Sequence, residues 1–83
     1  MQNNQKIILE SLSMDLLRAA LGRHRGSHVM ADRFIAESQK RIEELDPTFN
    51  INIINGLKQV LATPSTRQAE DLLMYSTLIR NRS

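Results

Sequence analysis

The stretch FNINIINGLKQVLA, residues 49–62, decides the fold class of this chain. Its beginning, FNINII, alternates between apolar and polar side chains, which is typical of a strand. Asn55 and Gly56 follow, and this dipeptide is a frequent turn of a β-hairpin. The sequence LKQVLA after the turn does not alternate cleanly, however, and a two-stranded hairpin alone is only marginally stable in water.

The same stretch also repeats with the period of a helix. Asp46 is suited to cap the first turn, and Pro47 fits the first helical position because no backbone N–H donor is needed there. One stripe then contains the apolar residues Phe49, Ile53, Ile54, Leu57, Val60 and Leu61, and only Ile51 lies outside it. We therefore predict a helix over residues 48–62 and keep the hairpin as the alternative.

Two further helices are predicted before this stretch, over residues 4–21 and 28–45. Gly22 follows the first as a C-cap, where a residue without a Cβ ends a helix without steric cost. Ser27 precedes the second as an N-cap. The core stripe of this second helix comprises Ala31, Phe34, Ile35, Ser38, Ile42 and Leu45, and charged residues occupy its opposite face.

A fourth helix is predicted over residues 66–81. Ser65 and Gln68 have the spacing of a capping box, in which each side chain bonds the backbone of the other residue. The core stripe of this helix comprises Ala69, Leu72, Leu73, Ser76 and Ile79. Short connections favour antiparallel neighbours. We predict an all-α chain in which residues 1–83 form a single helical domain, a compact four-helix bundle made of two antiparallel helical hairpins.

The composition limits the classes of protein to which this chain can belong. Its 83 residues suffice for one small domain, and because only 4% are aromatic the core must be aliphatic. The absence of cysteine excludes disulfides, thiolate chemistry and zinc fingers, and it favours a reducing compartment. No apolar run is long enough for a membrane span, and the first residues lack the pattern of a secretory signal. We expect a cytoplasmic protein without cofactors and without membrane contact.

The stretch LGRHRGSHVMADRF, residues 21–34, concentrates positive charge in a chain whose net charge is only +2. Between residues 21 and 31 its basic side chains are Arg23, His24, Arg25 and His28, and no carboxylate occurs between residues 16 and 31. Free N–H groups at the start of the following helix and forked guanidinium donors both favour an anion. We predict that these four residues form a loop that binds an anion or a partner, and the alternative is a solvated turn.

His24, His28 and Asp32 follow one another at intervals of four residues. On one continuous helix they would share a face and could together bind a metal ion. Gly26 and Ser27 interrupt such a helix, so the two histidines are not held over one another. We predict no metal site and expect His28 to be exposed or hydrogen-bonded to Asp32.

The first predicted helix is apolar on too many sides to be covered by one neighbour. Met14 and Leu17 lie outside its core stripe, and Met74 and Leu78 lie outside the stripe of the fourth helix. Exposed apolar clusters usually contact a partner, and methionine is common where surfaces must adapt. We predict that these four residues form an apolar interface with a protein partner or with a second copy of this self-associating chain.

Sequence motifs favour binding over catalysis. The chain has no cysteine nucleophile, no G-x-S-x-G motif and no H-E-x-x-H motif, and its histidines are confined to one loop. A helix-turn-helix is the alternative: Arg67 and Gln68 stand where base contacts would be made, although Glu70 and Asp71 on the same turn would face phosphates. We predict a non-catalytic protein–protein interaction module of the adaptor or regulatory type, and a nucleic-acid-binding regulator is the second prediction.

Overall fold

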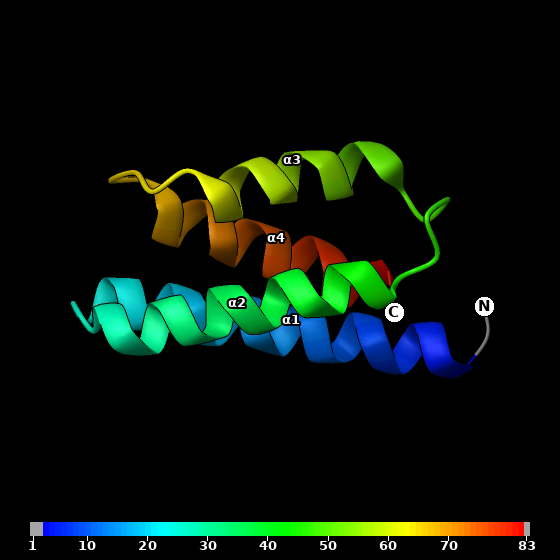
Figure 1. Cartoon of the computed structure of the whole chain (residues 1–83), viewed down its shortest axis with the longest axis horizontal. Coiled ribbons are helices and arrows are strands. Elements are labelled where there is room, and N and C mark those ends of the chain that lie inside the picture. Colours follow the sequence, from blue (N-terminus) through cyan, green and yellow to red (C-terminus); the bar gives the residue numbers. More distant parts are fainter. Residues whose placement is uncertain (1–2, 83) are drawn as a thin grey trace.

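A computed structural model describes residues 3–82 and shows two helical hairpins packed on one another (Figure 1). The helices are α1 (Asn3–His24), α2 (His28–Glu44), α3 (Ile51–Ala62) and α4 (Gln68–Arg82). Over the described range there is no strand, so the all-α four-helix bundle is confirmed and the hairpin alternative for residues 49–62 is wrong. No helix within residues 3–82 has the length and apolar character that crossing a membrane requires.

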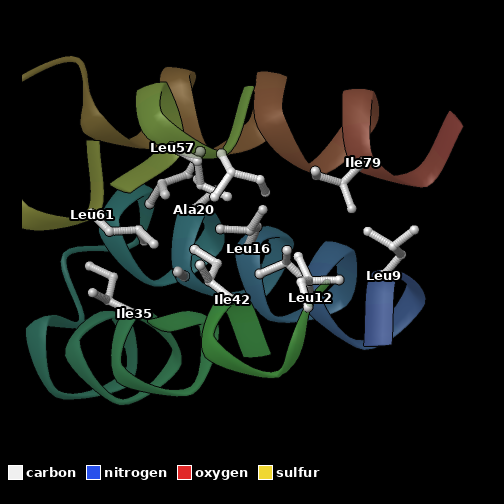
Figure 2. Packing of buried hydrophobic residues seen from close by; sticks show 13 residues of the cluster. Leu9, Leu12, Leu16, Ala20, Ile35, Ile42, Leu57, Leu61 and Ile79 are labelled. Carbon is white, nitrogen blue, oxygen red and sulfur yellow. The ribbon is translucent and has the colours of Figure 1, made fainter. Parts of the chain in front are cut away.

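Helix α1 lies at the centre of the packing. It contacts α2 and α4 along most of its length, whereas α3 touches α2 and α4 much less. Figure 2 shows Leu12 and Leu16 of α1 inside the cluster, with Ile42 of α2 and Ile79 of α4 beside them. The completely buried side chains of α1 are Leu9, Leu12, Leu16 and Ala19. The predicted aliphatic core therefore forms, and α1 contributes the largest share of it.

The turn between α1 and α2 differs from the prediction in its capping residue. Gly22 does not end α1; the helix continues to His24, and Gly26 adopts the left-handed conformation with φ 76°. The Ser27 N–H donates to the Gly22 carbonyl at 2.8 Å, and the Gly26 N–H donates to the Arg23 carbonyl at 3.2 Å. This pair of bonds is a Schellman motif, which satisfies the last carbonyls of a helix. Ser27 is the N-cap of α2 as predicted, but its hydroxyl makes no capping hydrogen bond.

Gly22 instead allows α1 and α2 to approach closely. A Cβ atom at this position would lie 2.8 Å from the backbone nitrogen of Ala31 and 3.2 Å from its Cβ. Backbone atoms cannot move aside as the end of a flexible side chain can. The glycine that the pattern identified as a helix stop is therefore a packing contact between two helices.

A second close contact joins α1 to α4 through two buried serines. The Ser13 hydroxyl donates to the carbonyl of Ser76 at 3.2 Å, and the Ser76 hydroxyl donates to the carbonyl of Ser13 at 2.8 Å. Each hydroxyl thus reaches the backbone of the opposite helix, which requires small side chains at the crossing. Because both polar groups are satisfied, their burial is not penalised.

Helix α3 begins later than predicted. The Asp46 carboxylate accepts hydrogen bonds from the backbone N–H and the hydroxyl of Thr48, at 2.9 and 2.7 Å. These bonds form a local turn instead of a helix cap. The N-cap of α3 is Asn50, in the left-handed region with φ 36°, and the helix starts at Ile51. Asp46 and Pro47 therefore belong to the loop, and their predicted capping roles are wrong.

The predicted capping box of α4 is wrong. The helix begins at Gln68, and the Ser65 hydroxyl accepts a hydrogen bond from the Arg67 N–H at 3.3 Å in the turn before it. The Gln68 side chain does not return to Ser65; it is buried, and its amide donates to the carbonyl of Val60 at 3.0 Å. Leu73, predicted in the core stripe, is also placed differently, because its side chain is half exposed.

Candidate functional site

Arg23 is the best-connected polar side chain of the predicted basic loop. Its Nε donates to the Gln68 side-chain oxygen at 2.7 Å, and its Nη2 donates to the Asp32 carboxylate at 3.0 Å. Its Nη1 lies 3.1 Å from Nδ1 of His28. Only 18% of the Arg23 side chain is exposed. The guanidinium therefore connects the end of α1 to the first turns of both α2 and α4.

Gln68, the first residue of α4, extends this hydrogen-bond network to α3. Its oxygen accepts from Arg23 while its amide nitrogen donates to Val60 near the end of α3. One buried amide thus joins α1, α3 and α4 through two hydrogen bonds. A buried amide that lost one of these partners would keep an unsatisfied polar atom.

Arg25 and His24 occupy a different environment from Arg23. Both side chains are exposed, and no carboxylate of residues 3–82 forms an ion pair with either of them. His28 and Asp32 are linked through the guanidinium of Arg23 and not directly to each other. The predicted anion contact remains a prediction, and in this geometry it rests on Arg25 and His24. No group of three or more metal-ligating side chains occurs among residues 3–82.

An apolar groove runs along the seam between α1 and α4, beside this loop. Its volume is about 350 Å³. The walls are formed by two consecutive turns of each helix, and the lining residues are Leu17, Ala20, Leu21, His24, Ala69, Glu70 and Leu73. Five of the seven are apolar, while His24 and Glu70 contribute the ionisable side chains. This arrangement suits the apolar side chains of a partner segment.

Of the four residues predicted as an apolar interface, Leu17 lines the groove and the other three are not among its lining residues, so their common interface stays a prediction. Met14 lies one turn from Leu17 on α1 and is half exposed. Met74 is half exposed on α4. Leu78 lies one turn beyond Tyr75, whose hydroxyl covers Gly56 of α3, so the helical period places Leu78 on the α3 side of α4.

Leu21 and Leu73 are groove residues that the sequence analysis did not assign to an interface. Leu73 was predicted in the core stripe of α4 because Leu72 and Leu73 are adjacent and differ by only 100° around the helix. In the structure Leu72 is completely buried and Leu73 is 49% exposed. The periodic pattern contains no signal for this choice, because it depends on where α1 crosses α4.

A second cleft, of about 300 Å³, lies between α1 and α2 beside Met14 and contains a nearly buried carboxylate. Asp15 lies 3.8 Å from Nε of Arg41 and 3.9 Å from Nη1 of Arg18, so both ion pairs exceed hydrogen-bonding distance. Burial raises the pKa of Asp15 above its ordinary value of 3.8; Arg41 and Arg18 oppose this shift, and Glu37 adds to it. Nε of Arg41 is itself buried without a hydrogen-bond partner.

The helix-turn-helix alternative loses one of its two base-reading residues. Gln68 is buried and uses both ends of its amide inside the protein, so it is not available to a base edge. Arg67 remains exposed, but Glu70 lies 4.0 Å from it. In a recognition helix the residues of the first turn must reach into the groove of the nucleic acid. The geometry therefore does not favour α4 as such a helix.

Comparisons of the sequence with protein-family models and with curated proteins, and of the structure with solved structures, found no match.

Proposed function

We propose that this protein is a small non-catalytic protein–protein interaction module of the adaptor or regulatory type. The observation that carries the proposal is the apolar groove between α1 and α4, formed by Leu17, Leu21 and Leu73. Leu21 and Leu73 remain 38% and 49% exposed, so their side chains are available to a partner. These leucines belong to α1 and α4, and the buried hydrogen bonds between Ser13 and Ser76 join the same two helices.

The chemistry around the groove indicates what kind of partner it suits. His24 lies at the end of the groove nearest the turn, and the exposed Arg25 follows it in the chain. An amphipathic helix that places apolar side chains between α1 and α4 would bring acidic side chains toward these basic groups. The partner surface is thus an apolar stripe with a negatively charged end.

Site-specific cross-linking in the source cell tests this proposal. A photoreactive amino acid replaces Leu73 in the groove, and in a matched control it replaces Lys40, which is exposed on the polar face of α2. We expect a discrete adduct from position 73 and none from position 40. Leu17→Asp, introduced beside the photoreactive group, should abolish the adduct because it places a charge in the apolar groove.

Two results would contradict the proposal. Equal adducts from both positions would show that the groove has no preference over an ordinary exposed site. An adduct that persists in the Leu17→Asp variant would show that contact occurs outside the groove. The mass of the adduct also distinguishes a second copy of this chain from a different protein.

A further inference from the structure

A stripe of exposed apolar residues runs along the outward face of α1. Ile7, Met14 and Leu21 follow one another at intervals of seven residues, and their exposed fractions are 61%, 45% and 38%. At the helical period these positions share one face, roughly opposite Leu12 and Leu16, which are completely buried. The stripe is therefore separate from the core that α1 forms with α2 and α4.

Helices that pack along one another have apolar residues at two positions of each heptad, and here Leu17 adds the second position to the heptad that begins at Met14. The stripe extends over two heptads, and α1, with 22 residues, is the longest helix of the bundle. Leu17 and Leu73 adjoin the stripe from the groove and widen the apolar surface toward α4. Small domains often gain the apolar burial that their own core lacks by self-association.

We propose that a second copy of this chain covers the stripe, with the two α1 helices antiparallel around a two-fold axis at Met14. The inference goes beyond the proposed function, because the covered stripe shares only Leu21 with the groove. The symmetry places Ile7 of one copy level with Leu21 of the second copy, and it places the two Met14 side chains opposite each other. The stripe is complementary to itself because its spacing is the same in both directions.

Charges on the same face favour the antiparallel orientation. Glu10 and Arg18 flank Met14 at equal distances in sequence, and both are exposed. The antiparallel arrangement brings Glu10 of one copy level with Arg18 of the second, twice in each dimer. A parallel arrangement would place Glu10 opposite Glu10 and Arg18 opposite Arg18 of the second copy. It would also bring together the two basic turns that contain Arg25. Like charges at an interface oppose association.

Arg18 lies on the α2 side of the stripe, where it also pairs with Asp15 at 3.9 Å. Its guanidinium carbon lies 5.6 Å from the centre of the Phe34 ring, and about half of its side chain is exposed. A cation held over an aromatic ring loses less side-chain freedom when it pairs with a carboxylate.

Molar mass in solution, measured on the full chain over a range of concentrations, tests this inference. We expect a dimer of about twice the chain mass of 9.5 kDa. Glu10→Arg alone and Arg18→Glu alone should each weaken the dimer, since each sets like charges opposite one another. An equimolar mixture of the two variants should restore it, because both contacts then join opposite charges. If the mixture dissociates as readily as each variant alone, the proposed pairing of Glu10 with Arg18 is wrong.

Cysteine pairing provides a second test, since the natural chain contains no cysteine. Ile7→Cys and Leu21→Cys change exposed positions and should leave the fold intact. Under oxidation, a mixture of the two should form a disulfide between positions 7 and 21, while each variant alone should remain unlinked. Disulfides within each single variant would indicate the parallel arrangement and overturn the inference. A monomer at all concentrations would also overturn it, whereas an adduct with another protein at position 73 would leave the proposed function standing.

Discussion

Helices α1 and α3 lie in the same bundle but differ in how closely they contact their neighbours. Besides its buried leucines, α1 has small residues at two of its contacts: Gly22 lies against Ala31, and Ser13 pairs with Ser76. Helix α3 faces the core with larger side chains, and its Gly56 lies under the hydroxyl of Tyr75 of α4.

This difference shows how side-chain size sets the distance between helices. Small residues let two backbones approach, and hydroxyl groups can then reach carbonyls across the contact. Larger residues hold the helices apart, and two clefts between α2 and α3, both lined by Ile42 and Lys58, are the result. The candidate interaction surface lies between α4 and α1, and α1 contacts its neighbours more extensively than α3 does.

Native-state hydrogen exchange should reveal the largest consequence of this contrast. We expect amides in the middle of α1 to exchange only through global unfolding. Amides of α3 should exchange through local openings whose free energy is about 2–4 kcal/mol lower, because α3 has fewer contacts to lose. Equal protection of α1 and α3 would show that the bundle unfolds as one unit and that the looser packing has no energetic effect.

The next largest effect concerns two arginines of one turn. Arg23→Ala should lower the free energy of unfolding by about 2–3 kcal/mol, because it leaves the buried oxygen of Gln68 without a partner. Arg25→Ala should change the stability by less than about 0.5 kcal/mol, since its side chain is exposed. Urea denaturation of both variants gives the comparison. Equal losses would mean that the three contacts of Arg23 do not stabilise the native state.

Two glycine substitutions compare a contact with backbone atoms, at Gly22, with a contact with the end of a side chain, at Gly56. Gly22→Ala should lower the stability by about 1–2 kcal/mol, because the new Cβ meets the backbone of Ala31, which cannot move aside. Gly56→Ala meets only the hydroxyl end of the Tyr75 side chain. That end can shift, and the higher helix propensity of alanine offsets the strain, so the net change should stay within about 0.5 kcal/mol. A reversed order in thermal denaturation would contradict this account of the packing.

The smallest effects should come from two carboxylates whose pKa values shift in opposite directions. The pKa of Asp15 is raised, mainly by burial, so the native state holds this proton more tightly than the unfolded chain does. The stability linked to Asp15 is therefore present at low pH and is lost as the pH rises from 3.8 through the raised value. Asp15→Asn should remove this slope and stabilise the protein at pH 7, by less than about 1 kcal/mol.

Asp46 provides the control with the opposite sign. Hydrogen bonds from the backbone and the hydroxyl of Thr48 lower the pKa of Asp46 below 3.8. Its contribution is present above pH 3.8 and is lost as the pH falls through the lowered value. Denaturation curves between pH 2 and pH 7 for Asp15→Asn and Asp46→Asn should therefore deviate from the natural chain in opposite directions. Deviations of the same sign would contradict the assignment of burial as the cause at Asp15.

The parts of the fold that could be predicted are those that depend on neighbours along the chain. The stripe of Ile54, Leu57 and Leu61 repeats at the helical period, and it outweighed the turn signal of Asn55–Gly56. The same pattern predicted the buried positions of α2, including Ser38, whose hydroxyl bonds the carbonyl of Phe34 within its own helix. These features need no information about other helices.

The candidate site could be predicted only in part for the same reason. Arg23 and Arg25 look equivalent in the sequence, and both belong to the basic turn. The structure separates them, because Arg23 faces Gln68, which is 45 residues away in the chain. No local pattern connects residues at that separation.

The sequence by itself determined that this chain forms four helices, that its core is aliphatic, and that two arginines and both histidines lie around one turn. The tertiary structure decided which glycine ends α1, which arginine is buried, and whether Leu72 or Leu73 faces the solvent. The physical reason is one of range. Helical periodicity and turn chemistry act over a few residues, whereas burial depends on which surfaces of distant segments come together when α1 crosses α2 and α4.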